Sequence, residues 1–170
     1  MFHYPVVGFS GSRHLAPIDK ELLAYASCCV PSSSRIHVGD APGVDRYFRD
    51  SFEDKRVTIF QSNGFAKSQL VARSIRFVKS LRDSGGCLVS FPSCPCPSQV
   101  VASSRSSVCF CGSGSGSWAS LAFAVGLGLP CFVALPYGVD CPPWLAYSSS
   151  YSESSGFIVI APPCRQLSIL

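Results

Sequence analysis

Short apolar segments alternate along the chain with longer amphipathic segments. Six of the short segments are almost uniformly apolar, as the buried strands of a parallel sheet are: 5–9, 35–38, 57–61, 87–91, 131–135 and 157–161. Apolar residues recur at helical spacing in the segments 18–29, 44–52, 66–82 and 118–127. This alternation predicts an α/β, Rossmann-like, doubly wound fold, with a mostly parallel sheet and helices on both faces.

Two segments fall outside this pattern, and both are predicted to be loops. Residues 92–107 are rich in Pro, Ser and Cys, and residues 147–155 are almost all Ser and Tyr. The first segment is long enough to be a lid over a site or a mobile connection. A chain of 170 residues fits one ordinary domain, so we expect residues 1–170 to form a single domain.

Residues 106–139 contain no charged side chain, which raises the question of a membrane span. Gly126, Gly128, Pro130 and Pro136 divide this stretch into a helix-sized piece and a strand-sized piece. We therefore expect buried elements and no membrane partner. The N-terminal sequence lacks the basic start and the unbroken apolar run of a secretory signal, which favours a cytoplasmic protein.

The ten cysteines are accordingly expected to be thiols. One residue separates Cys94 from Cys96 and Cys109 from Cys111, whereas two to four residues usually separate paired zinc ligands. We predict no metal and no other cofactor; a metal or redox role for these thiols is the alternative. The net charge of +4 suits an anionic small molecule or weak contact with nucleic acid.

Three glycine-rich turns, at 8–13, 39–45 and 112–117, are each predicted to follow a strand and precede a helix. In a parallel sheet the strand-to-helix turns lie at one edge, so segments far apart in sequence converge there. Glycine lets the backbone approach a ligand closely, and the N–H groups at a helix start favour phosphate. The turns therefore predict a pocket for a nucleotide or sugar phosphate. The alternative for each turn alone is a tight turn followed by a helix cap.

Individual side chains in and near these turns have distinct expected roles. Arg13 is expected to bind phosphate, and Asp45 to accept hydrogen bonds from ribose hydroxyls at a helix start, unless it only caps that helix. Trp118 is expected either to stack on a base or to lie in the core. Arg73 and Arg76 form a solvated helix face or contribute to the anion site. The candidate ligand-binding residues are Gly11, Ser12, Arg13, Gly39, Asp40, Ala41, Gly43, Asp45, Arg73, Gly114, Ser115, Gly116, Ser117 and Trp118.

These motifs together resemble the SLOG superfamily, which includes the DNA-processing protein DprA, the LOG phosphoribohydrolases and the YspA-like proteins. The resemblance rests on Gly-Ser-Arg at 11–13, the turn at 39–45, Ala-Arg at 72–73, and Gly-Ser-Gly-Ser-Trp at 114–118. It extends from Val6 to about Pro136 and is greatest to the small YspA-like and DprA-like branch. It implies a Rossmann-like fold that binds nucleotides or nucleotide-derived ligands, with the glycine turns contacting phosphate and ribose.

The chain departs from the phosphoribohydrolases at their motif Pro-Gly-Gly-x-Gly-Thr-x-x-Glu. Ser120 stands where the catalytic glutamate would be, and a hydroxyl cannot replace a carboxylate as a charge or as a proton acceptor near neutral pH. Activity by that mechanism is therefore disfavoured. Asp40 and Asp45 are the remaining, weak catalytic candidates.

The expected function is binding of a nucleotide-derived ligand, as a sensor or a sequestering protein. One alternative is a nucleotide-metabolising enzyme that hydrolyses an N-glycosidic or phosphate bond. Another is DprA-like binding of single-stranded nucleic acid, favoured by the basic residues in 66–82. The apolar C-terminal half would also allow a homo-oligomer.

Overall fold

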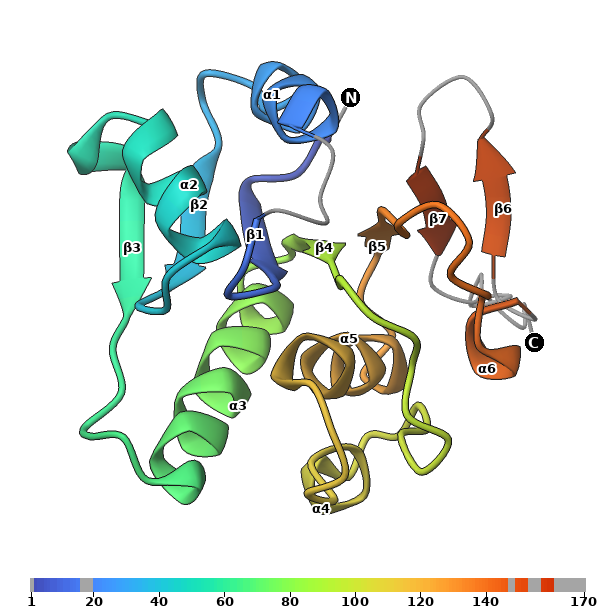
Figure 1. The fold of residues 1–170 in the computed structure, drawn as a ribbon. Helices are drawn as coiled ribbons and strands as arrows, with labels where there is room; N and C mark the ends of the chain where they lie inside the picture. Colours follow the sequence, from blue (N-terminus) through green and yellow to red (C-terminus); the bar gives the residue numbers. More distant parts are fainter. Residues whose placement is uncertain (1, 16–19, 147–148, 153–156, 161–170) are drawn as a thin grey trace, which may run out of the picture.

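The structure is a computed structural model that describes residues 2–15, 20–146, 149–152 and 157–160, and its strands form one seven-stranded sheet (Figure 1). The strands are β1 (Val6–Gly11), β2 (Arg35–Gly39), β3 (Val57–Phe60), β4 (Cys87–Phe91), β5 (Cys131–Val133), β6 (Ser149–Ser152) and β7 (Phe157–Ile160). The helices are α1 (Lys20–Cys28), α2 (Val44–Ser51), α3 (Lys67–Asp83), α4 (Ser106–Cys109), α5 (Gly116–Gly126) and α6 (Pro143–Ala146), with a 3₁₀ turn η1 (Asp54–Arg56).

The strand order is β3-β2-β1-β4-β5-β7-β6. The first five strands in this order are parallel, and β7 and β6 continue the sheet with antiparallel pairing. The order 3-2-1-4-5 is that of a doubly wound sheet, in which the direction of winding reverses between β1 and β4. The predicted α/β, Rossmann-like class with a mostly parallel sheet is confirmed.

Helices cover both faces of the sheet (Figure 1). Side chains alternate along each strand, so Val7 and Phe9 pack with α1 and α2, whereas Val6 packs with α3 and α5. On the α1 and α2 face, the ring of Phe9 stacks on that of Phe48 of α2, with 3.6 Å between the ring centroids. The predicted placement of helices on both faces is therefore confirmed.

The prediction of a loop at 147–155 is wrong for residues 149–152, which form β6. They pair antiparallel with β7, in the register Ser149 to Ile160 through Ser152 to Phe157. The Ser- and Tyr-rich sequence lacks the uniformly apolar character of the other strands, so it gave no strand signal. The strand forms because its backbone pairs with that of β7. Residues 147–148 and 153–156 lie outside the described residues, as do the expected helix start at 18 and the expected strand end at 161.

The predicted loop at 92–107 is confirmed as far as residue 105, where the short helix α4 follows. Core side chains hold its backbone. The indole N–H of Trp118 donates to the carbonyl of Cys94 at 2.8 Å, and that of Trp144 donates to the carbonyl of Val100 at 3.0 Å. Ser103 lies against the end of α5, at Gly126. The segment therefore forms a wall packed on α5 and is anchored at several points along its length.

The uncharged stretch at 106–139 is divided among α4, α5 and β5, as its glycines and prolines predicted. Among the residues that the structure describes, no helix combines the length and the apolar character needed to cross a membrane.

The packing of the 92–107 segment on α5 generates a stability prediction at Gly126. A Cβ added there would lie 2.1 Å from the backbone carbon of Ser103, so Gly126→Ala should lower the free energy of unfolding by about 1–3 kcal/mol. Gly116→Ala is the matched control at the other end of α5, where a Cβ would meet no atom within 4 Å. That control should be neutral or stabilising by up to about 1 kcal/mol. Urea denaturation measures both, and equal effects would contradict the packing.

Candidate functional site

A cavity of about 390 Å³ lies where the carboxyl ends of β1 and β2 meet α3 and the start of α5. Residues of all three glycine turns line it: Ser10–Arg13 from the first, Gly39, Ala41 and Asp45 from the second, and Gly112–Ser117 from the third. It adjoins the reversal between β1 and β4, where doubly wound sheets bind their ligands. Its size is within the range of small-molecule sites.

Glycine allows the first two turns and the end of β4 to pack directly on one another. Gly43 has a φ of 75°, and a Cβ on it would lie 2.3 Å from the carbonyl oxygen of Ser12, which accepts the N–H of Val44 at 3.0 Å. A Cβ on Gly11 would lie 2.7 Å from the carbonyl oxygen of Phe91, which accepts the N–H of Ser12. These two glycines thus fix the relative position of the turns, and Gly43 itself does not line the cavity.

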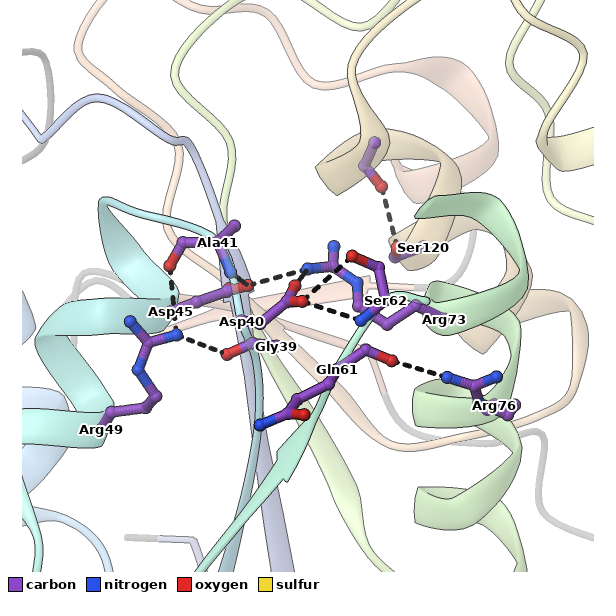
Figure 2. A network of polar contacts seen from close by, with 11 residues as sticks. Gly39, Asp40, Ala41, Asp45, Arg49, Gln61, Ser62, Arg73, Arg76 and Ser120 are labelled. Atoms are coloured by element: carbon purple, nitrogen blue, oxygen red, sulfur yellow. Dashed lines mark hydrogen bonds and ion pairs between the residues drawn. The ribbon is translucent and has the colours of Figure 1, made fainter. Parts of the chain in front are cut away.

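The second turn carries a cluster of two carboxylates and one guanidinium (Figure 2). Asp40 accepts hydrogen bonds from the N–H of Ser62 at 2.7 Å and from its hydroxyl at 3.1 Å, and it is ion-paired with Arg73. The same Nη1 of Arg73 lies 3.7 Å from Oδ2 of Asp45. The side chain of Arg73 is only 13% exposed, so it is part of this cluster and not of a solvated helix face. Arg76 is exposed and donates to the carbonyl of Gln61.

The two carboxylates differ in how well their charge is compensated. Burial raises the pKa of Asp40, but the bonds from Ser62 and Arg73 outweigh it and hold the pKa below its usual value. Asp45 is 9% exposed and accepts one N–H, from Ala41 at 3.3 Å. Burial raises the pKa of Asp45 to about 6, because Arg73, this N–H and Arg49 offset burial only in part. Asp45 therefore titrates near neutral pH on the cavity wall.

The third turn follows the helix α4 and not a strand, which corrects the prediction, and it leads into α5 with backbone donors that no described residue engages. The first helical hydrogen bond runs from the N–H of Ala119 to the carbonyl of Ser115, so the N–H groups of residues 116–118 precede the ladder. The hydroxyls of Ser115 and Ser117 bond to each other. Ser120 donates its hydroxyl to the carbonyl of Gly116 at 2.8 Å, which engages it with the helix backbone (Figure 2).

Two cations on the cavity wall carry charge that no carboxylate neutralises within the described part of the chain. Arg13 is exposed and makes no ion pair there, and Lys67 donates to the carbonyl oxygen of Gly112 at 2.8 Å. Arg73 also lines the cavity, but Asp40 and Asp45 balance its charge. The turn side of the cavity is therefore suited to an anion.

Trp118 lies in the core and not in the cavity. It is fully buried, its indole N–H is bonded to Cys94, and its ring meets that of Trp144 edge-on at 6.2 Å between centroids. This corrects its inclusion among the ligand-binding candidates, because the helix directs the side chain under the 92–107 segment. Asp40 also does not line the cavity; it positions Arg73. Apart from Gly43, the remaining candidates all line it: Gly11, Ser12, Arg13, Gly39, Ala41, Asp45, Arg73, Gly114, Ser115, Gly116 and Ser117.

Sequence reasoning missed the walls that face these turns. Helix α3 supplies Lys67, Leu70, Val71, Ser74 and Phe77, and the connection before α5 supplies Ser93, Val100 and residues 109–111. The predicted topology contained one signal that could have indicated these walls. The helix after β3 packs beside α5, next to the point where the direction of winding reverses. The helical spacing of apolar residues in 66–82 does not show which of them border a cavity.

The thiols form no recognisable metal centre in the described residues, where no three His, Cys, Asp or Glu side chains are grouped to hold an ion. The nine described cysteines are free. Burial raises the pKa of Cys87 and Cys131, which lie in adjacent central strands. Hydrogen bonds from Ser113 lower the pKa of Cys111, which lines the cavity.

No protein-family model, no curated protein and no solved structure matches this chain. The resemblance of the three turns to the SLOG superfamily therefore remains a prediction from the motifs. Any assignment of function rests on the geometry and chemistry of the cavity.

The raised pKa of Asp45 predicts a specific pH dependence of stability. A carboxyl whose pKa rises from 3.8 unfolded to about 6 folded binds more protons in the folded state, so its contribution falls as pH rises from 4 to 6. Asp45→Asn removes this loss. The free energy of unfolding of Asp45→Asn minus that of the wild type should therefore increase by on the order of 3 kcal/mol between pH 4 and pH 7.

Comparing the two proteins at each pH cancels the effect of His37, whose burial lowers its pKa and gives the opposite slope near pH 6. Asp50→Asn is the matched control, since Asp50 lies on the same helix and is 66% exposed. A difference between Asp45→Asn and the wild type that stays constant with pH would contradict the raised pKa.

Proposed function

We propose that this protein binds a nucleotide or a nucleotide-derived ligand in the cavity, as a SLOG-type sensor or sequestering protein. One observation carries the proposal: three glycine turns from separate segments of the chain open onto a single cavity of about 390 Å³. A tight turn with a helix cap needs no such convergence. The cavity wall also carries Arg13, which makes no ion pair among the described residues, and the buried carboxylate of Asp45. These two side chains suit the phosphate and the hydroxyls of one ligand, respectively.

The phosphate is proposed to bind between the start of α5 and Arg13. The N–H groups at the start of α5 carry the positive end of the helix dipole. Gly116 supports this position, because no atom lies within 4 Å of where its Cβ would be, so a ligand can approach the backbone. Arg13 adds a guanidinium, which pairs well with phosphate oxygens.

The ribose is proposed to bind at Asp45. The carboxylate accepts only the N–H of Ala41 as a hydrogen bond from the described residues, which leaves lone pairs for ligand hydroxyls. Its neighbours support this role: Arg49 donates to the carbonyl oxygens of Gly39 and Ala41 and thereby fixes the turn (Figure 2).

A nucleotide-metabolising enzyme is the second candidate, and the pKa of Asp45 favours it. A carboxyl that titrates at about 6 and lines a cavity is suited to general acid or base catalysis. Ser120 is not a suitable replacement for the family glutamate, because its hydroxyl is bonded to Gly116. Nucleic-acid binding has less support, because the net charge of +4 is modest and two of the basic residues of α3, Arg73 and Arg82, are ion-paired with Asp40 and Asp83.

Calorimetry against a panel of nucleotides, including cyclic nucleotides and ADP-ribose, tests the proposal. We expect at least one nucleotide to bind at a stoichiometry of one per chain. Chromatography of the recovered ligand then separates the two candidates, since an unchanged ligand supports a binding protein and a released base supports an enzyme. A chain that binds none of the panel contradicts both.

Gly116→Trp should abolish this binding, because the new side chain would project from the start of α5 into the space beside the backbone donors. The fold should tolerate it, as the added Cβ meets no atom. Ser68→Trp is the control, since Ser68 is exposed on α3 and does not line the cavity. If Gly116→Trp has the same free energy of unfolding as the wild type and binds the nucleotide as tightly as the control, the cavity is not the ligand site.

A further inference from the structure

The cavity has a second half whose chemistry differs from that of the turns. Its walls there are apolar and come from α3, through Leu70, Val71 and Phe77, and from the connection before α5, through Val100 and Phe110. Lys67, at the start of α3, donates its ammonium to the carbonyl oxygen of Gly112 in the third turn, and Arg73 is ion-paired with Asp40 and lies close to Asp45, so these apolar walls themselves carry no unpaired cation among the described residues. A second phosphate group is therefore a poor occupant for it.

Ser74 is the polar exception on this apolar wall. It lies on α3, is 8% exposed and lines the cavity, and its hydroxyl has no hydrogen-bond partner among the described residues. Three other helical serines, Ser27, Ser51 and Ser120, each donate to the carbonyl four residues earlier. Ser74 is thus a buried residue whose hydroxyl is left available at the cavity.

Strand β1 provides a similar hydroxyl on the facing side. Ser10 shares the α3 face of the sheet with Gly8, whose Cβ would touch Leu81 of α3. Ser10 lines the cavity, and its hydroxyl also has no partner in the described part of the chain. Its register neighbour Ser90 on β4 is fully buried, and Oγ of Ser90 lacks a partner among the described residues. Ser10 and Ser74 therefore each present to the cavity a hydroxyl that a ligand can bond.

We propose that this half of the cavity is a nucleobase subsite in which Ser74 hydrogen-bonds the edge of the base. A flat heteroaromatic ring fits the requirements of both walls, since its faces pack on apolar side chains and its edge carries donors and acceptors. A hydroxyl serves either kind of edge group, because it both donates and accepts. An alkyl group would leave Ser74 and Ser10 unpaired. This inference rests on the proposed function, and it adds a site for the base to the proposed sites for the phosphate and the ribose.

Calorimetry with AMP, GMP, CMP, UMP and ribose 5-phosphate tests this subsite. The tightest of the four nucleotides should bind at least about 10-fold more tightly than ribose 5-phosphate, which lacks a base. Ser74→Ala should weaken that nucleotide about 5- to 10-fold, the usual effect of one lost hydrogen bond, and leave ribose 5-phosphate unchanged. Ser68→Ala is the matched control on the exposed side of α3, and neither affinity should change.

The outcomes separate this inference from the proposed function. Ribose 5-phosphate that binds as tightly as all four nucleotides would overturn the base subsite and leave the phosphate site standing. A nucleotide preference that Ser74→Ala does not reduce would also overturn the assigned role of Ser74. If neither the nucleotides nor ribose 5-phosphate bind, the proposed function and the subsite both fail.

Discussion

The site depends on one constraint of the sheet, the placement of β4 beside β1. The chain builds β1, β2 and β3 outward in one direction and then returns across β1 to add β4 and β5 on the other side. Connections on the two sides of this reversal diverge, so a crevice opens beyond the carboxyl ends of the central strands. The three turns and the inner faces of α3 and α5 surround that crevice. Close contacts at Gly11 and Gly43 bring the turns together without side chains filling the space between them.

Electrostatics then divide the crevice into unlike parts. Asp40 is ion-paired with Arg73 and accepts two further hydrogen bonds from Ser62, so the negative charge of Asp40 is well compensated. Asp45 shares the same arginine at a longer distance and stays under-compensated. Arg13 and the start of α5 give the cavity wall a positive character. Away from the turns the walls become apolar, with isolated hydroxyls. This gradient from charged to apolar matches a ligand with a phosphate, a sugar and a base.

The sequence predicts the scaffold well and the site in part. Uniformly apolar strands and spaced glycines are local signals, so the parallel strands and the turns can be located from them. Trp118 follows a glycine turn, and only its contacts with Cys94 and Trp144, distant in sequence, place it in the core. Ser74 and Leu70 belong to a helical pattern that does not distinguish a face packed on the core from a face on a cavity. Residues 149–152 pair through their backbone, which composition does not reveal.

The central claim is that the three turns and the apolar wall of α3 form one site for one ligand. A crystal structure of the protein with its tightest nucleoside monophosphate tests this most directly. We expect the phosphate at the N–H groups of residues 116–118, the ribose at Asp45 and the base against α3 beside Ser74. A nucleotide bound elsewhere on the surface, or a crevice filled by the protein's own side chains, would contradict it.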